Sequence, residues 1–141
     1  MKAVLIYETL TGNTRRAAHL IADELYRHRI GARLFSTAAV EAEAVARADL
    51  VIVGTWTDGL LVVGQRPGRK GRLRRSLPDL SGKRCAVYCT YAIDSGHTLD
   101  KLTAVCEQRG AEVVGGLAIR RDRLVAGSHD FVDRLTDALV T

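Results

Sequence analysis

The chain has 141 residues and a mass of 15.4 kDa, which suits one domain over residues 1–141 and leaves no room for two. Hydrophobic residues make up 47% and charged residues 26%, a balance that excludes a disordered chain, a collagen and a disulfide mini-protein. The formal net charge of +5 and a pI near 9.4 bear on the partners of the protein rather than on its fold.

No segment has the pattern of a membrane helix or an export signal. The longest apolar runs are residues 3–7, 50–53 and 60–63. All are far shorter than the roughly 20 residues that a spanning helix needs, and the first run is too short for a signal peptide. Cys85, Cys89 and Cys106 are odd in number and form no CxxC pair, so we expect buried, reduced thiols in a cytoplasmic protein.

The hydrophobic pattern predicts five strands that alternate with five helices. The expected strands are residues 2–7, 32–35, 49–54, 83–90 and 111–119. The expected helices are residues 13–29, 38–48 and 70–77, one around 99–106 that Gly110 closes, and one that begins at Ser128. Gly31 is expected to stop the first helix and Ser128 to be the N-cap of the last. This alternation predicts an α/β protein with three layers, in which helices cover both faces of an open parallel sheet.

Ligands of such sheets bind at the carboxyl ends of the strands, so the turn after the first strand is the first candidate site. It consists of Thr9, Leu10, Thr11, Gly12, Asn13 and Thr14. Three hydroxyls, a glycine and the N–H groups of the following helix together favour an anion cradle. No GK[ST] or GxGxxG is present, which excludes a nucleoside triphosphate loop and a dinucleotide fingerprint. The alternative is a threonine-rich capping turn without a ligand.

The pattern YxTxTGNT at residues 7–14 resembles the phosphate loop of the flavodoxin family. In that family a [ST]xTGxT turn holds the 5′-phosphate of FMN without a basic side chain. The element order and length of the whole chain are similar to that family, whereas the residue-level likeness is specific to this loop. The resemblance implies a flavodoxin-like sheet with strand order 2-1-3-4-5 and one noncovalently bound FMN.

The segment after the third strand is the second candidate. It contains Thr55, Trp56, Thr57, Asp58 and Gly59. Trp56 is the only tryptophan of the chain, and its flat ring can stack on an isoalloxazine. The resemblance implies that Asp58 and Gly59 form the peptide that responds to flavin reduction. The alternative is that Trp56 packs into the core against Leu60 and Leu61.

The segment after the fourth strand is the third candidate. The resemblance implies that it covers the second face of the flavin, with Thr90, Tyr91 and Asp94 as its binding residues and Tyr91 as the stacking side chain. The family's usual T-G-D with a later tyrosine is missing here. Asp94 or Ser95 can equally well be the N-cap of the next helix. No nucleophile or zinc pattern occurs, so we expect no catalytic or metal-binding side chains and any chemistry must come from a cofactor.

A basic run departs most from the family, whose members are commonly acidic. Its cations are Arg66, Arg69, Lys70, Arg72, Arg74 and Arg75. The run predicts redox partner proteins with an acidic docking face, although it can also be a solvated loop without a specific partner. Aromatic residues make up only 5%, so we do not expect nucleic acid to bind. We expect a monomer without membrane attachment.

The resemblance implies an electron carrier that shuttles electrons between a reductase and an acceptor. One alternative is an FMN-dependent reductase of quinones or similar small acceptors, but nothing in the chain resembles a nicotinamide site. Another alternative is a binding module without flavin that uses its basic loop. Colour in the purified protein distinguishes the flavoproteins from the last of these.

Overall fold

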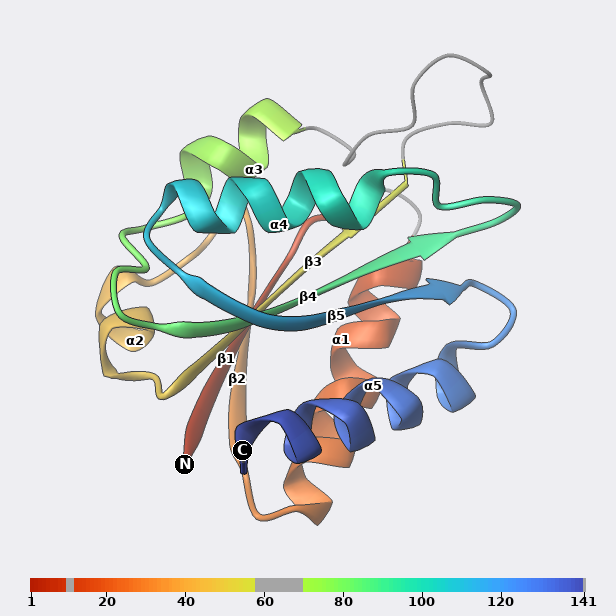
Figure 1. The fold of residues 1–141 in the computed structure, drawn as a ribbon, viewed down its shortest axis with the longest axis horizontal. Helices are drawn as coiled ribbons and strands as arrows, with labels where there is room; N and C mark the ends of the chain where they lie inside the picture. Colours follow the sequence, from red (N-terminus) through yellow and green to blue (C-terminus); the bar gives the residue numbers. More distant parts are fainter. Residues whose placement is uncertain (10–11, 58–69, 141) are drawn as a thin grey trace.

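Five parallel strands form one sheet with the order β2-β1-β3-β4-β5 (Figure 1). The computed structural model describes residues 1–9, 12–57 and 70–140. The strands are β1 (Lys2–Tyr7), β2 (Gly31–Ser36), β3 (Leu50–Trp56), β4 (Arg84–Tyr91) and β5 (Glu112–Arg120). The helices are α1 (Asn13–Arg27), α2 (Ala42–Arg47), α3 (Lys70–Ser76), α4 (Thr98–Gln108) and α5 (Leu124–Leu139). The predicted fold class and strand order are confirmed.

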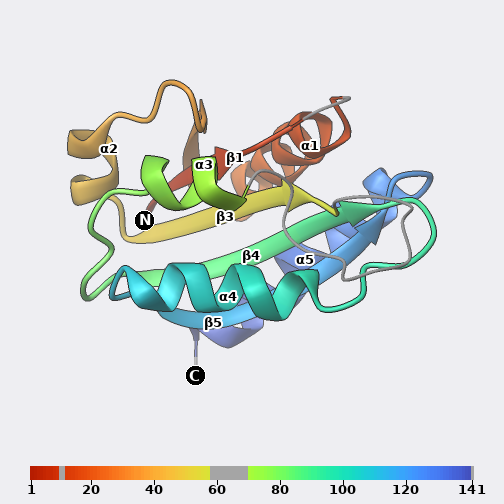
Figure 2. The ribbon, with the colours of Figure 1, turned by 90° about the horizontal axis from the view of Figure 1, so that it is seen from above.

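The helices form two layers on opposite faces of the sheet, as Figure 2 shows from above. On one face, apolar residues of α1 and α5, including Ile21 and Phe131, pack against the strands. On the other face, α2, α3 and α4 do the same through residues such as Val45, Leu73 and Leu102. Burial on both faces explains why β1 and β3 are almost wholly apolar. None of the described helices is long and apolar enough to span a membrane.

The carboxyl ends of the parallel strands meet at one edge of the sheet, where α1, α4 and α5 begin. Backbone hydrogen bonds continue the sheet beyond the strand ends there, from Glu8 N to Gly54 O (2.9 Å) and from Thr57 N to Thr90 O (2.8 Å). At this edge β3 extends beyond the expected strand, because it includes Thr55 and Trp56, and β4 ends one residue later than expected, at Tyr91. Threonine, tryptophan and tyrosine favour strands, which agrees with this extension. These candidate residues lie on strand ends rather than in loops.

Two predicted helix boundaries near the start of the chain are wrong. Helix α1 ends at Arg27, and Arg29 takes a left-handed backbone (φ 62°) after it, whereas Gly31, the expected stop, begins β2. The buried side chain of Ile30 explains the early stop, because it turns the chain back onto the core. Helix α2 begins at Ala42 rather than at residue 38.

Two predicted N-caps are also wrong. Helix α5 begins at Leu124, because the buried side chain of Leu124 draws an extra turn of helix onto the core. Ser128 consequently lies inside α5 and is completely buried. Helix α4 is preceded by His97 rather than by Asp94 or Ser95.

Candidate functional site

The described residues between β1 and α1 leave open space at the start of α1. Gly12 has φ 96°, which favours glycine, and its N–H donates to Thr9 Oγ1 at 3.0 Å. Apart from its chain neighbours, no described residue has an atom within 4 Å of the place where a Cβ of Gly12 would stand, and no described side chain caps the helix there. An uncapped helix start beside open space suits an anion. Leu10 and Thr11 lie outside the described residues.

Thr14, in the first turn of α1, is tied to β4 by two buried hydrogen bonds. Its hydroxyl lies 3.0 Å from the hydroxyl of Thr90, and its carbonyl accepts a 2.9 Å hydrogen bond from the hydroxyl of Tyr88. Within the hydroxyl pair one group donates to the other, so one O–H remains able to donate elsewhere. The first and third candidate segments therefore meet at one point.

The end of β3 carries polar groups that lack partners within the described part of the chain. The indole Nε1 of Trp56 and the hydroxyl of Thr57 are both buried without a hydrogen bond there. The neighbouring Thr55 is buried, whereas Trp56 as a whole is only partly buried. Such orphaned groups cost free energy until something pairs with them. Asp58 and Gly59 lie outside the described residues, as do the Leu60 and Leu61 proposed as alternative neighbours of Trp56.

The end of β4 places Tyr91, which is partly buried, next to the buried Thr90. The carbonyl of Tyr91 accepts a hydrogen bond from Arg121 N at 2.9 Å, which holds this strand end against the chain that follows β5. Asp94 is exposed, and its Oδ1 accepts a hydrogen bond from Gly96 N at 3.0 Å in a local turn. In the described structure this hydrogen bond of Asp94 therefore lies within the turn and does not join it to another candidate residue.

Sequence reasoning missed two side chains that support this edge. Tyr88 is completely buried on β4, and Glu8, directly before the candidate segment at residues 9–14, is 3% exposed. The carboxylate of Glu8 accepts a hydrogen bond from the hydroxyl of Thr37 at 3.0 Å, which joins the turns after β1 and β2. Two signals in the sequence could have indicated these residues. One is a tyrosine inside an apolar strand, and the other is a carboxylate next to a buried strand, because each polar group needs a hydrogen-bond partner when it is buried.

Burial makes two of the described side chains at this edge poor acids near neutral pH. Burial raises the pKa of Cys89 to about 12, partly offset by the nearby hydroxyl of Thr57. Burial also raises the pKa of Tyr88 well above its ordinary value. Among the described residues no group of three or more His, Cys, Asp and Glu side chains could hold a metal ion. The carboxyl edge therefore combines a helix start that suits an anion with two buried polar groups, Trp56 Nε1 and Thr57 Oγ1, that have no hydrogen-bond partner among the described residues.

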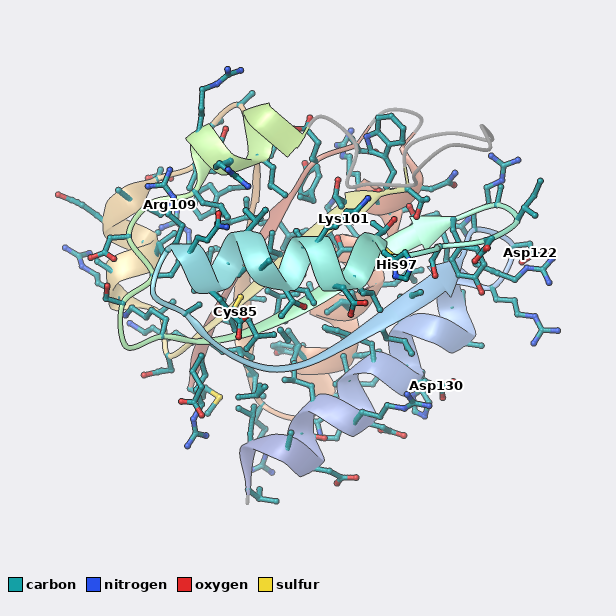
Figure 3. The ribbon with its side chains drawn as sticks, turned by 45° about the horizontal axis from the view of Figure 1, so that its top comes forward. Cys85, His97, Lys101, Arg109, Asp122 and Asp130 are labelled. Atoms are coloured by element: carbon teal, nitrogen blue, oxygen red, sulfur yellow. The ribbon has the colours of Figure 1, made fainter. Side chains whose placement is uncertain are left out.

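Figure 3 shows residues at the carboxyl edge of the sheet and residues at the opposite end of the molecule. His97, before α4, and Asp122, after β5, lie at the carboxyl edge, whereas Arg109 lies at the other end of α4. The doubly wound parallel sheet defines an α/β protein of the kind that binds its ligand at the carboxyl edge of the sheet.

The chain belongs to the flavodoxin family, because the family model for flavodoxin matches residues 5–131. Membership of this family implies that it binds a flavin, typically FMN. The space beside Gly12 fits the phosphate of such a group, and the partly buried Trp56 offers a flat side chain suited to the flavin ring. No curated protein matches the chain significantly.

Solved flavodoxin structures share the fold. Flavodoxin 2 from Bacillus cereus is 24% identical with a TM-score of 0.77, and the match covers 97% of this chain and 99% of that one. The flavodoxin of Streptococcus pneumoniae TIGR4 is 22% identical with a TM-score of 0.71, and the match covers 95% and 99%. Two-electron reduced flavodoxin from Megasphaera elsdenii is 18% identical with a TM-score of 0.71, and the match covers 93% and 98%.

Proposed function

We propose that the chain binds one FMN noncovalently at the carboxyl edge and carries electrons between a reductase and an acceptor. The observation that supports this most is the 3.0 Å contact between the hydroxyls of Thr14 and Thr90, which joins the phosphate loop to the end of β4. The 2.8 Å hydrogen bond from Thr57 N to Thr90 O adds the end of β3 to this pair, so that three segments far apart in the sequence lie together, as a nucleotide-sized cofactor requires. Bound FMN would supply the redox chemistry, since the described side chains offer none.

Each segment has a part in this proposal. Residues 9–14 hold the phosphate through hydroxyls and backbone N–H groups. Trp56 and Tyr91 lie on either side of the ring and exclude water from it. Asp58 and Gly59 form the peptide that responds to reduction. The buried Tyr88 fixes the first turn of α1 by its hydrogen bond to Thr14.

The partners in this proposal carry an acidic docking face. Besides the predicted basic run, exposed arginines flank the carboxyl edge in the described part of the chain. They are Arg15 and Arg16 in the first turn of α1, and Arg121 and Arg123 next to the start of α5. Positive charge around the flavin speeds the approach of an acidic partner. We place the protein in the cytoplasm as a monomer, where the three free cysteines stay reduced.

A test of flavin reduction by NADPH or NADH distinguishes an electron carrier from a self-contained reductase. The protein is loaded with FMN and mixed without oxygen with NADPH or NADH, alone or with a trace of ferredoxin–NADP reductase. We expect the flavin absorbance to bleach only when the reductase is present. Rapid bleaching by NADPH or NADH alone would contradict the carrier and favour the reductase.

The charge of the docking face is tested with two small oxidants of opposite sign. Added salt should slow reoxidation of the reduced protein by ferricyanide, an anion, and should speed reoxidation by hexaammineruthenium, a cation, because salt screens both interactions. Arg121→Glu should reduce both salt effects, whereas Arg47→Glu on α2, an equal charge change at the opposite end, should not. The reverse salt dependence would contradict a basic docking face.

A further inference from the structure

The outer edge of β5 is open in the described structure. In Figure 1 β5 runs between α4 and α5, and it pairs with β4 alone. Its nine residues include no proline or lysine, and Gly115 and Gly116 at its centre are exposed. Residues 113–119 make no hydrogen bond on the side away from β4 to any described residue. An unpaired strand edge of this kind is a template for another extended chain.

A hollow of about 140 Å³ lies alongside this edge, between β5 and α5. Residues 114–117 of β5 and Ala86 of β4 form one wall, and Phe131, Leu135 and Ala138 of α5 form the other. Small residues contribute to its lining, and a Cβ on Gly115 would meet no described atom within 4 Å other than those of its chain neighbours. A cavity of about 150 Å³ holds a molecule the size of benzene, so this one accepts a single medium-sized apolar side chain.

One positively charged side chain borders the hollow. Arg134 is the one charged residue among the described residues that line it, and its side chain is exposed. It makes no ion pair with any described residue, whereas the neighbouring Asp133 lies 3.3 Å from His129. Asp130 and Asp137 also lie on α5 but do not line the hollow. A carboxylate next to an apolar anchor would therefore find an arginine available.

We propose that β5 and α5 form a docking groove for an extended peptide segment of a partner protein. The segment adds a strand to β5, inserts an apolar side chain of about the size of leucine into the hollow, and pairs a carboxylate with Arg134. Main-chain hydrogen bonds to the open edge supply affinity, and the hollow and the arginine supply specificity. The groove lies along the middle of β5 and the second half of α5, so this interaction does not require the carboxyl edge or a flavin.

The proposal is tested with a fluorescein-labelled peptide, acetyl-Thr-Val-Leu-Thr-Glu-Val-amide. In a strand its leucine and glutamate point to the same face, as the groove requires. We expect its binding, measured by fluorescence polarisation, to weaken about tenfold when the glutamate is replaced by lysine. Amide shifts in a nitrogen-15 NMR spectrum should concentrate at residues 112–120 and 131–138. Absence of binding at millimolar peptide, or shifts centred on the carboxyl edge, would overturn the proposal.

Variants of the groove sharpen this test. Arg134→Glu should reverse the preference, so that the lysine peptide binds better than the glutamate peptide. Ala138→Leu should fill the hollow and weaken both peptides about tenfold. Arg47→Glu, an equal charge change on α2, should bind as the unaltered protein does. An unchanged peptide preference in Arg134→Glu would contradict the groove, and circular dichroism verifies that each variant is folded.

Discussion

The ring of Tyr88 in β4 lies directly over Gly54 in β3 and fills the space that a Cβ of Gly54 would occupy. The ring packs edge-on against Phe131 of α5 with 5.9 Å between centroids, and the hydroxyl donates to the carbonyl of Thr14. One buried side chain therefore links two strands and two helices directly beneath the phosphate loop. The glycine is required because the ring must cross β3 to reach its hydrogen-bond partner.

We expect Gly54→Ala to destabilise the protein by about 3 kcal/mol, because the added methyl group overlaps the Tyr88 ring in a packed core. Urea denaturation of the protein without flavin measures this. Gly31→Ala is the matched control, since a Cβ there meets no atom within 4 Å, and we expect it to change stability by less than about 1 kcal/mol. Equal stability of the two variants would show that the Tyr88 ring moves aside freely.

We expect substitutions of Thr14 and Thr90 to have coupled effects on the free energy of unfolding, because the two hydroxyls share a hydrogen bond. Each single change to valine leaves the other hydroxyl buried without its partner and should cost about 1–3 kcal/mol of stability. The double variant should cost less than the sum by at least about 0.5 kcal/mol. The free energies of unfolding of the four proteins give this coupling, and strict additivity would contradict a mutual hydrogen bond.

Two valine variants of the proposed phosphate loop test FMN binding. Thr14→Val, and Thr11→Val in the part of the loop outside the described residues, should each weaken FMN binding by about 1–3 kcal/mol, because the phosphate loses a donor. Fluorescence titration with FMN measures this loss. Thr103→Val on α4 is the control, because α4 lies on the opposite face of the sheet from α1. Unchanged affinity in both loop variants would move the phosphate to another site.

The sequence predicted those features that depend on neighbouring residues. Local periodicity indicated β1 and β3 through their continuous apolar runs and α1 through its helical spacing. The structure confirms all three elements. The strand order required the resemblance of the loop at residues 7–14, because periodicity alone does not order a sheet. Element type and order could therefore be predicted from the chain.

Features that depend on distant residues could not be predicted. The start of α5 at Leu124 is set by burial of that side chain, which outweighs the capping preference of Ser128. The bond between Tyr88 and Thr14 spans 74 residues, so no local pattern marks it. For the site, the sequence indicated the segments that meet, whereas the buried supports Tyr88 and Glu8 emerged only from their contacts.

The three cysteines should be unreactive in the folded protein. All are buried and free. A hydrogen bond with Cys106, and then burial, raise the pKa of Cys85 well above its ordinary value, while burial raises that of Cys89 to about 12. Because the thiolate is the reactive form, Ellman's reagent at neutral pH should label none of them before unfolding in urea. The exposed variant Ser81→Cys is the positive control, and fast labelling of the unaltered protein would contradict this burial.

His129 should make stability depend on pH. Its Nδ1 lies 3.1 Å from Glu24 of α1 and its Nε2 lies 3.3 Å from Asp133. The hydrogen bond to Glu24, followed by the charges of Asp133, Glu24 and Asp130, raises the pKa of His129 above its ordinary 6.5. The charged form is therefore favoured in the folded state. Its stabilisation should be complete below pH 6.5 and lost as the pH rises through the raised value.

The melting temperature of His129→Gln as a function of pH tests this link between α1 and α5. The variant should melt below the unaltered protein in acid, and the two curves should converge at alkaline pH. His28→Gln, a change at an exposed histidine just after α1, is the control and should run parallel to the unaltered protein. A constant difference between His129→Gln and the unaltered protein at every pH would exclude a titrating contact.

Titration of the purified protein with FMN tests the central claim most directly. An absorbance scan of the protein as isolated comes first, followed by quenching of FMN fluorescence as protein is added. We predict flavin absorbance in the isolated protein, or quenching with a dissociation constant below about 1 µM, which corresponds to roughly 8 kcal/mol of binding free energy. A colourless protein that leaves FMN fluorescence unchanged would contradict the proposed electron carrier.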